Sequence, residues 1–306
     1  MKNVLICMAA AGATLLTDPA TALDIVIDYS YDDIGFFSSS SRRSVLDQAA
    51  ASFESILSDD LLAINSGAGN HFNARFFDPE STTNGIITLP DYSVASDTLI
   101  VFVGARQLGG TTLGVGGSGF YTVSGSPAFA DTVETRGEGV TQGGSATDFG
   151  PWGGSMAFDV DTSWYFDDDA STLEAFSGFD FYSVALHELA HVLGYGQADS
   201  WENLISGSNF VGPASMDAFG SAVPLAGGAH WANGTVSQLP DGSFQEVAMD
   251  PSISSGSRKY LTELDLAGLT DIGWQVAAVP EPAEWAMLLG GLALVAGASR
   301  RRRGSP

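Results

Sequence analysis

Cysteine and histidine are both scarce in this sequence, because its 306 residues contain one Cys and four His. The single cysteine, Cys7, lies in an N-terminal apolar stretch typical of an export signal, so the processed chain is expected to have no disulfide and no thiolate metal ligand. Basic residues are also few, since 12 Lys and Arg stand against 36 Asp and Glu and give a net charge of −24. A chain this acidic disfavours nucleic acid and anionic lipid as partners.

The N-terminal segment indicates a secretory signal peptide. Lys2 precedes an apolar stretch from Val4 to Leu16, and a small-residue cleavage site ends at Ala22. We therefore expect residues 1–22 to be removed on export. A buried N-terminal helix and a lipoprotein signal at Cys7 are the alternatives, and the short apolar run and the bulky residue before Cys7 disfavour them.

The C-terminal segment has a second processing pattern. A linker over residues 277–282 contains Pro-Glu-Pro, and residues 283–306 hold an apolar run that ends before Arg300–Arg303. This run is shorter than the ~20 residues of an ordinary spanning helix. The arrangement resembles the PEP-CTERM sorting signal of Gram-negative bacteria. The resemblance implies cleavage by an exosortase-type processing enzyme, membrane contact only through this segment before cleavage, and export to the cell envelope or extracellular matrix. A simple membrane anchor is the alternative.

Residues 23–276 are expected to form one domain of the α+β class, with subdomains at 23–194 and 195–276. Leu23–Tyr29 alternates as a strand does, and apolar residues recur at helical spacing from Ser44. Three further strands are predicted, at Ile86–Leu89 after an Asn-Gly turn, at Thr98–Val103 and at Ser155–Val160. The Gly-rich residues 104–155 are interpreted as long surface loops over one sheet, in preference to a linker between two domains.

The sequence His-Glu-Leu-Ala-His at residues 187–191 is the strongest functional pattern. On a helix, the two histidines leave the same face one turn apart and can share a metal ion, while Glu188 projects beside them toward a metal-activated water. The helix is predicted to begin near Asp180–Ser183, whose side chains can cap it, and to end at Gly194.

A hydrolytic zinc ion takes three protein ligands, so His187 and His191 need a partner. In the compact pattern HExxHxxGxxH the third His would fall at position 197, where this chain has Gln197. Of the other histidines, His71 lies far upstream among aromatic residues and is interpreted as structural or solvent-facing. His230 lies 39 residues after His191 and stays a candidate.

Gly194, His230-Trp231, residues 245–249 and residues 261–274 follow in order the pattern of leishmanolysin-like metzincins, which this region resembles. The resemblance implies a metzincin-like zincin fold, with a mixed twisted sheet, a backing helix, an active-site helix and an irregular C-terminal subdomain. It implies one catalytic Zn²⁺ bound by His187, His191 and His230, with Glu188 as general base and Met249 as the Met-turn residue under the metal. Tyr260 is a candidate oxyanion stabiliser by analogy, and Trp231 and Trp274 are expected to be packing residues.

The resulting hypothesis is a secreted zinc endopeptidase that acts on protein or peptide substrates through a water activated by zinc. The alternative is a matrix or surface structural protein with a structural or vestigial zinc site, and a zinc hydrolase of another bond is a third possibility. The acidic clusters Asp159–Asp161 and Asp167–Asp169 offer hard oxygen ligands, so a structural Ca²⁺ is considered as well.

Overall fold

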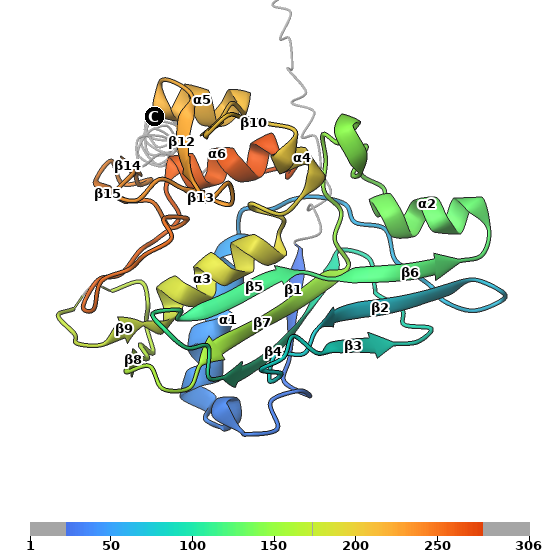
Figure 1. Cartoon of the computed structure of the whole chain (residues 1–306), viewed down its shortest axis with the longest axis horizontal. Coiled ribbons are helices and arrows are strands. Elements are labelled where there is room, and N and C mark those ends of the chain that lie inside the picture. Colours follow the sequence, from blue (N-terminus) through green and yellow to red (C-terminus); the bar gives the residue numbers. More distant parts are fainter. Residues whose placement is uncertain (1–22, 173, 278–306) are drawn as a thin grey trace, which may run out of the picture.

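A four-stranded mixed sheet is the main scaffold of the computed structural model, which describes residues 23–172 and 174–277 (Figure 1). The signal-peptide, linker and PEP-CTERM predictions lie outside these residues, apart from residue 277. The sheet order is β1-β4-β7-β5, with parallel pairing of β1, β4 and β7 and an antiparallel edge strand β5. The bounds are β1 Asp24–Asp28, β4 Thr98–Arg106, β7 Gly153–Asp159 and β5 Gly114–Ser118.

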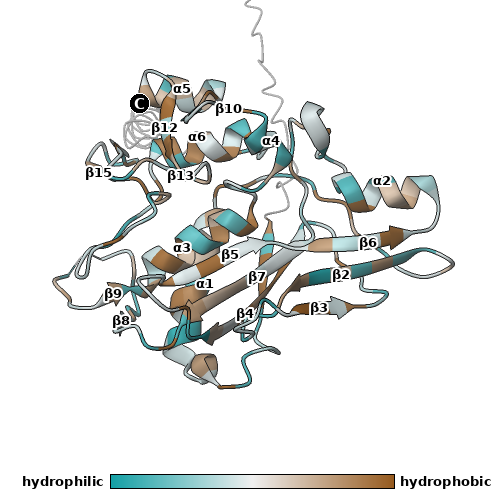
Figure 2. Ribbon diagram, in the orientation of Figure 1, coloured by the Kyte–Doolittle hydropathy of each residue, from teal (hydrophilic) through white to brown (hydrophobic). Residues whose placement is uncertain are grey.

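Helices α1 (Ser40–Glu54) and α3 (Phe181–Val192) pack against each other and against the sheet (Figure 1). Apolar residues gather along β4 and β7 in Figure 2, and every residue of β7 is buried, as expected for a strand covered on both faces. Phe158 and Phe181 pack with ring centroids 4.6 Å apart. Helix α1 begins four residues before the predicted start at Ser44, because its first turn is polar and adds nothing to the apolar periodicity.

The interpretation of residues 104–155 as long surface loops is wrong. The segment contains β5, strand β6 (Phe120–Ser124), helix α2 (Pro127–Thr135) and the 3-10 turn η2 (Gly143–Ser145). Strand β6 joins a second sheet of order β3-β2-β6, with β2 at His71–Phe77 and the predicted strand β3 at Ile86–Leu89. Glycine has a low strand propensity, so its run at 114–119 gives no local strand signal.

The chain after Gly194 is irregular, as predicted, and lies on the other side of α3 from the sheet (Figure 1). Its buried centre is aromatic, and Trp231 and Trp274 are packing residues, as predicted. The remaining elements are η1 Phe36–Ser38, β8 Trp164–Tyr165, β9 Phe179–Asp180, α4 Asp199–Glu202, β10 Ile205–Ser206, β11 Asn209–Phe210, α5 Pro213–Phe219, β12 Val223–Ala226, β13 His230–Trp231, β14 Val236–Gln238, β15 Phe244–Glu246 and α6 Glu263–Asp271.

Within the described ranges, none of the helices is both long enough and apolar enough to cross a membrane. The domain thus has the α+β architecture expected from the sequence, with a sheet, a backing helix α1 and the motif-bearing helix α3 in its centre.

Candidate metal centre and active-site cleft

Helix α3 carries the first two histidines and is fixed at both ends, as the sequence predicts. At its start, the Asp180 carboxylate accepts hydrogen bonds from the Ser183 N–H at 3.1 Å and the Ser183 hydroxyl at 2.6 Å. At its end, Gly194 adopts φ +95°, which glycine tolerates best. The helix is buried over almost its whole length, so the positions of His187 and His191 are set by core packing.

The third histidine is brought to the same point by the distant strand β13. The Nε2 atom of His230 lies 3.0 Å from that of His191 and 3.1 Å from that of His187, and the last two are 3.2 Å apart. Gly196, at φ +72°, packs directly against the backbone of Ala229, and a Cβ there would clash with the Ala229 carbonyl. This contact lets β13 lie close to the turn after α3.

The hydrogen bonds of two histidines determine which ring nitrogen carries the proton. Nδ1 of His187 lies 2.8 Å from the Ala248 carbonyl, and Nδ1 of His191 lies 2.7 Å from the Tyr195 carbonyl. A carbonyl oxygen only accepts, so Nδ1 is the donor in both rings and Nε2 keeps its lone pair. Burial also lowers the pKa of His191 to about 4 and that of His187 well below its usual range.

This arrangement fits zinc. Two lone pairs that face each other at 3.2 Å repel, unless a cation lies between them. Tetrahedral Zn²⁺ with Zn–N bonds of ~2.0–2.1 Å places its ligand nitrogens about 3.3 Å apart, close to the three distances observed. Among the described residues, this trio is the one group of three or more His, Cys, Asp or Glu side chains close enough to share a metal ion.

Glu188 stands beside the trio and is 6% exposed. Burial raises its pKa to about 8, and the N–H of Gly116 on β5 opposes part of this rise. Strand β5 lies directly against the helix here, since a Cβ on Gly114 would be 2.8 Å from the Glu188 carboxylate and one on Gly116 would clash with the Glu188 backbone. Only glycine therefore allows the edge strand to approach so closely.

The histidines and Glu188 open into a cleft of about 610 Å³ between β5 and the segment that follows Met249. Sequence reasoning identified the motif but missed most of the cleft walls, because they come from the glycine strand and from residues distant along the chain. The lining residues include Thr111 to Gly116, Phe179, Ser183, Val184, Gln197, Ala229, Ala248, Asp250 to Ile253 and Lys259.

Met249 is fully buried in the segment that positions His187. The carboxylate of Asp265, on α6, accepts hydrogen bonds from the N–H groups of Ala248 at 2.8 Å and Met249 at 3.1 Å. Because the Ala248 carbonyl bonds the His187 ring, Asp265 acts on the metal centre through one intervening residue.

Two residues considered in the sequence lie apart from the cleft. The hydroxyl of Tyr260 donates to the Ala170 carbonyl at 2.8 Å, and the residue is not among those that line the cleft, so its candidacy as oxyanion stabiliser is wrong. His71 is on β2, half-exposed, and its Nδ1 pairs with Asp91 at 2.6 Å. The solvent-facing interpretation of His71 agrees with this position.

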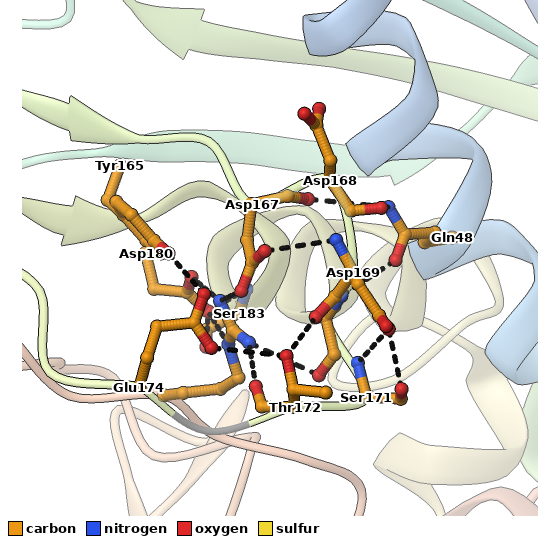
Figure 3. A network of polar contacts seen from close by, with 12 residues as sticks. Gln48, Tyr165, Asp167, Asp168, Asp169, Ser171, Thr172, Glu174, Asp180 and Ser183 are labelled. Atoms are coloured by element: carbon orange, nitrogen blue, oxygen red, sulfur yellow. Dashed lines mark hydrogen bonds and ion pairs between the residues drawn. The ribbon is translucent and has the colours of Figure 1, made fainter.

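Calcium finds no support in the acidic clusters. Asp167 forms an ion pair with Arg258 at 2.8 Å. Asp169 accepts hydrogen bonds from the N–H and the hydroxyl of Ser171 (Figure 3). Asp159 accepts from the Leu108 N–H at 3.0 Å and from a neighbouring threonine hydroxyl. These carboxylates are directed at protein donors instead of a shared centre.

Comparison with known families agrees with the site. The model of the Matrixin family matches residues 131–207, which include α3 and the His-Glu-Leu-Ala-His sequence but end before His230. Comparisons with curated proteins and with solved structures gave no match. The fold and the Matrixin match together support a zinc-dependent metallopeptidase of the metzincin type.

Proposed function

We propose that the protein is an exported zinc endopeptidase of leishmanolysin-like type. The observation that carries the proposal is the convergence of three histidine Nε2 atoms at 3.0–3.2 Å beside a buried glutamate in an open cleft. A structural zinc site has four protein ligands, whereas this site offers three and faces a cavity.

In this proposal His187, His191 and His230 would hold zinc, and the buried Met249 would be the Met-turn residue. Bound zinc supplies Lewis acidity, which acidifies a water molecule and polarises a peptide carbonyl. Glu188 accepts a proton from the attacking water and later donates it to the departing amine.

The Glu188→Gln variant tests this assignment. It removes the base but keeps the size of the side chain, so zinc content should stay at one per chain while the rate of casein hydrolysis falls by about 10²- to 10⁴-fold. The measurement is metal content by mass spectrometry together with proteolysis, with a chelator control. Zinc-replete wild-type protein without activity on casein or a broad peptide library would favour the alternative of a matrix or surface protein with a vestigial site. Activity on other amides would favour a different zinc hydrolase.

The His230→Ala variant separates this arrangement from one in which only the helix binds metal. With two ligands left, both zinc and activity should be lost. A zinc-replete and fully active variant would contradict the assignment.

Export and processing are part of the same proposal. We infer removal of residues 1–22, cleavage near Pro-Glu-Pro by an exosortase-type enzyme, and release to the cell envelope or matrix of a Gram-negative bacterium. The supporting observation is the pattern of the two end segments in the sequence. Mass spectrometry of the secreted protein would identify both ends, and unprocessed termini would contradict this part.

A further inference from the structure

The glutamine at the third-ligand position of the compact pattern contacts the edge strand. Gln197 is exposed, and its Nε2 donates to the carbonyl of Gly116 at 3.0 Å across a separation of 81 residues. A Cβ on the neighbouring Gly117 would lie 2.8 Å from Oε1 of the same side chain. Gln197 therefore links the turn after α3 to β5.

The register of β5 shows which of its backbone groups face the cleft side. Leu113 accepts from Asp159 on β7 at 2.9 Å, and Gly119 donates to Gly153 at 2.7 Å. Backbone groups alternate along an antiparallel strand, so those of Gly114, Gly116 and Ser118 point away from β7 toward the free edge.

Gly116, the central residue of these three, already contacts other residues of the protein. The Gly116 carbonyl accepts from Gln197, and a Cβ on Gly116 would clash with the backbone of Glu188, so Gly116 is in close contact with that residue. Gly114 and Ser118 flank it with their edge groups directed outward. An extended peptide can add to such an edge as a further strand.

Gln197 also lies where two cavities meet. It lines the main cleft and a second cavity of about 290 Å³, which adjoins the cleft at Val115 and Gly116 and extends toward Phe77 and Arg106. The contact from Gln197 to β5 thus lies on the border that an extended substrate would cross.

We propose that Gln197 is a positioning residue for the peptide substrate, an inference that rests on the proposed endopeptidase function. Its hydrogen bond holds β5 against α3, so that the edge groups of Gly114 and Ser118 are presented on both sides of Glu188. Those two residues are four apart, about 13 Å along a strand, so only a peptide of roughly five or more residues reaches both.

The test replaces Gln197 by Met, which removes the donor at similar length, and by Lys, which keeps a donor. Gln107→Met is the matched control, because Gln107 is also exposed and donates at 2.8 Å to the side chain of Asp161 and not to the β5 backbone. Hydrogen exchange over residues 113–119 and steady-state kinetics with a long and a short peptide are measured on the zinc-loaded protein.

With Gln197→Met, exchange over residues 113–119 should accelerate without a change in Tm, and KM for the long peptide should rise roughly three- to ten-fold with kcat little changed. The short peptide should be unaffected, Gln197→Lys should restore both quantities, and the Gln107→Met control should match wild type. Unchanged exchange in the Met variant would overturn the proposal, as would faster exchange throughout the protein with a lower Tm. Hydrogen exchange can be measured without catalytic turnover. An inactive wild-type protein would therefore contradict the proposed function, while the exchange data would still test the contact between Gln197 and β5.

Discussion

Residues 23–194 and residues 195–277 each bury an arginine, and the two are held in different ways. In the first region, the guanidinium of Arg136 donates only to backbone carbonyls, those of Leu62, Ala95, Thr98 and Pro151, at 2.8–3.1 Å. Burial lowers the pKa of Arg136 to about 10. In the second, Arg258 reaches back to the first region and pairs with Asp180 at 2.9 Å and Asp167 at 2.8 Å. Burial alone would lower the pKa of Arg258, but these two carboxylates raise it.

This difference extends to the way each region is stabilised. The first region packs a regular sheet and two helices around an apolar core. The second has short elements, and its buried aromatic residues belong to the same apolar core. Buried carboxylates also fix it: Asp265 holds the Met249 segment, and Asp180, which caps α3, pairs with Arg258. The cleft lies between these regions, so its geometry depends on buried charge as well as on apolar packing.

The largest expected effect comes from breaking the pairing of Arg258. Arg258→Met leaves two carboxylates buried without a cation and should lower the free energy of unfolding by about 3–5 kcal/mol. Arg136→Met leaves neutral carbonyls unsatisfied and should lower it by about 1–3 kcal/mol. Urea denaturation of both variants measures the difference.

The pH dependence of stability distinguishes the two variants further. Arg258 helps to hold the pKa of Asp167 below its usual value, so without it that pKa should rise in the folded protein, and a buried unpaired carboxylate destabilises the fold most when ionised. The loss in free energy of unfolding caused by Arg258→Met should therefore shrink as the pH falls toward 5, while the loss caused by Arg136→Met stays constant. Equal losses with equal pH dependence would remove the distinction between the regions.

The same contrast explains what the sequence could predict. Helix α3 was predictable in its ends and its metal-binding face, because capping by Asp180, apolar periodicity and Gly194 are local properties. Strand β5 was not, because its glycines fit a close approach to Glu188 that exists only in the folded chain. The pairing of Arg258 with Asp180 joins residues 78 apart, and local sequence has no trace of it.

A smaller effect is expected where a carboxylate supports the metal centre indirectly. Asp265→Asn turns an acceptor into a donor that faces N–H groups, so the free energy of unfolding should fall by about 2 kcal/mol. Ala248 would shift with its carbonyl, which orients His187, and zinc affinity should fall about 10- to 100-fold. Competition with a chromogenic chelator measures the affinity.

Asp271→Asn is the matched control for this prediction. Asp271 lies on the same helix and accepts from the N–H groups of Ala214 and Ser215 at 2.8 Å, with no connection to a histidine. Its variant should lose stability but keep the zinc affinity of wild type. Equal losses of affinity in both variants would show that Asp265 acts only through general stability.

The smallest effect concerns an acidic seam between the regions, formed by Glu138, Asp148, Asp59 and Asp60. Burial, followed by the charges of Asp148, Asp59 and Asp60, raises the pKa of Glu138 from 4.5 to about 7. Asp59 also accepts from the N–H of Gln275 at 3.0 Å, which places this cluster where the end of the second region meets the first. Between pH 4.5 and about 7 the folded state binds the proton more tightly than the unfolded chain, so stability falls as the pH rises through this window.

Glu138→Gln should remove that penalty. Glu138 is only partly buried, so solvent screening reduces the gain to about 0.5–1 kcal/mol at pH 8, and at pH 4 the variant and wild type should be equally stable because the carboxyl is protonated in both states. Glu134→Gln is the control, since it makes the same change of charge at an exposed position of α2. Thermal unfolding at the two pH values decides the matter. If the gain in stability were equal at pH 4 and pH 8, or equal in the Glu134→Gln control, net charge and not this seam would set the effect. The second region would then be joined to the first without a local electrostatic cost.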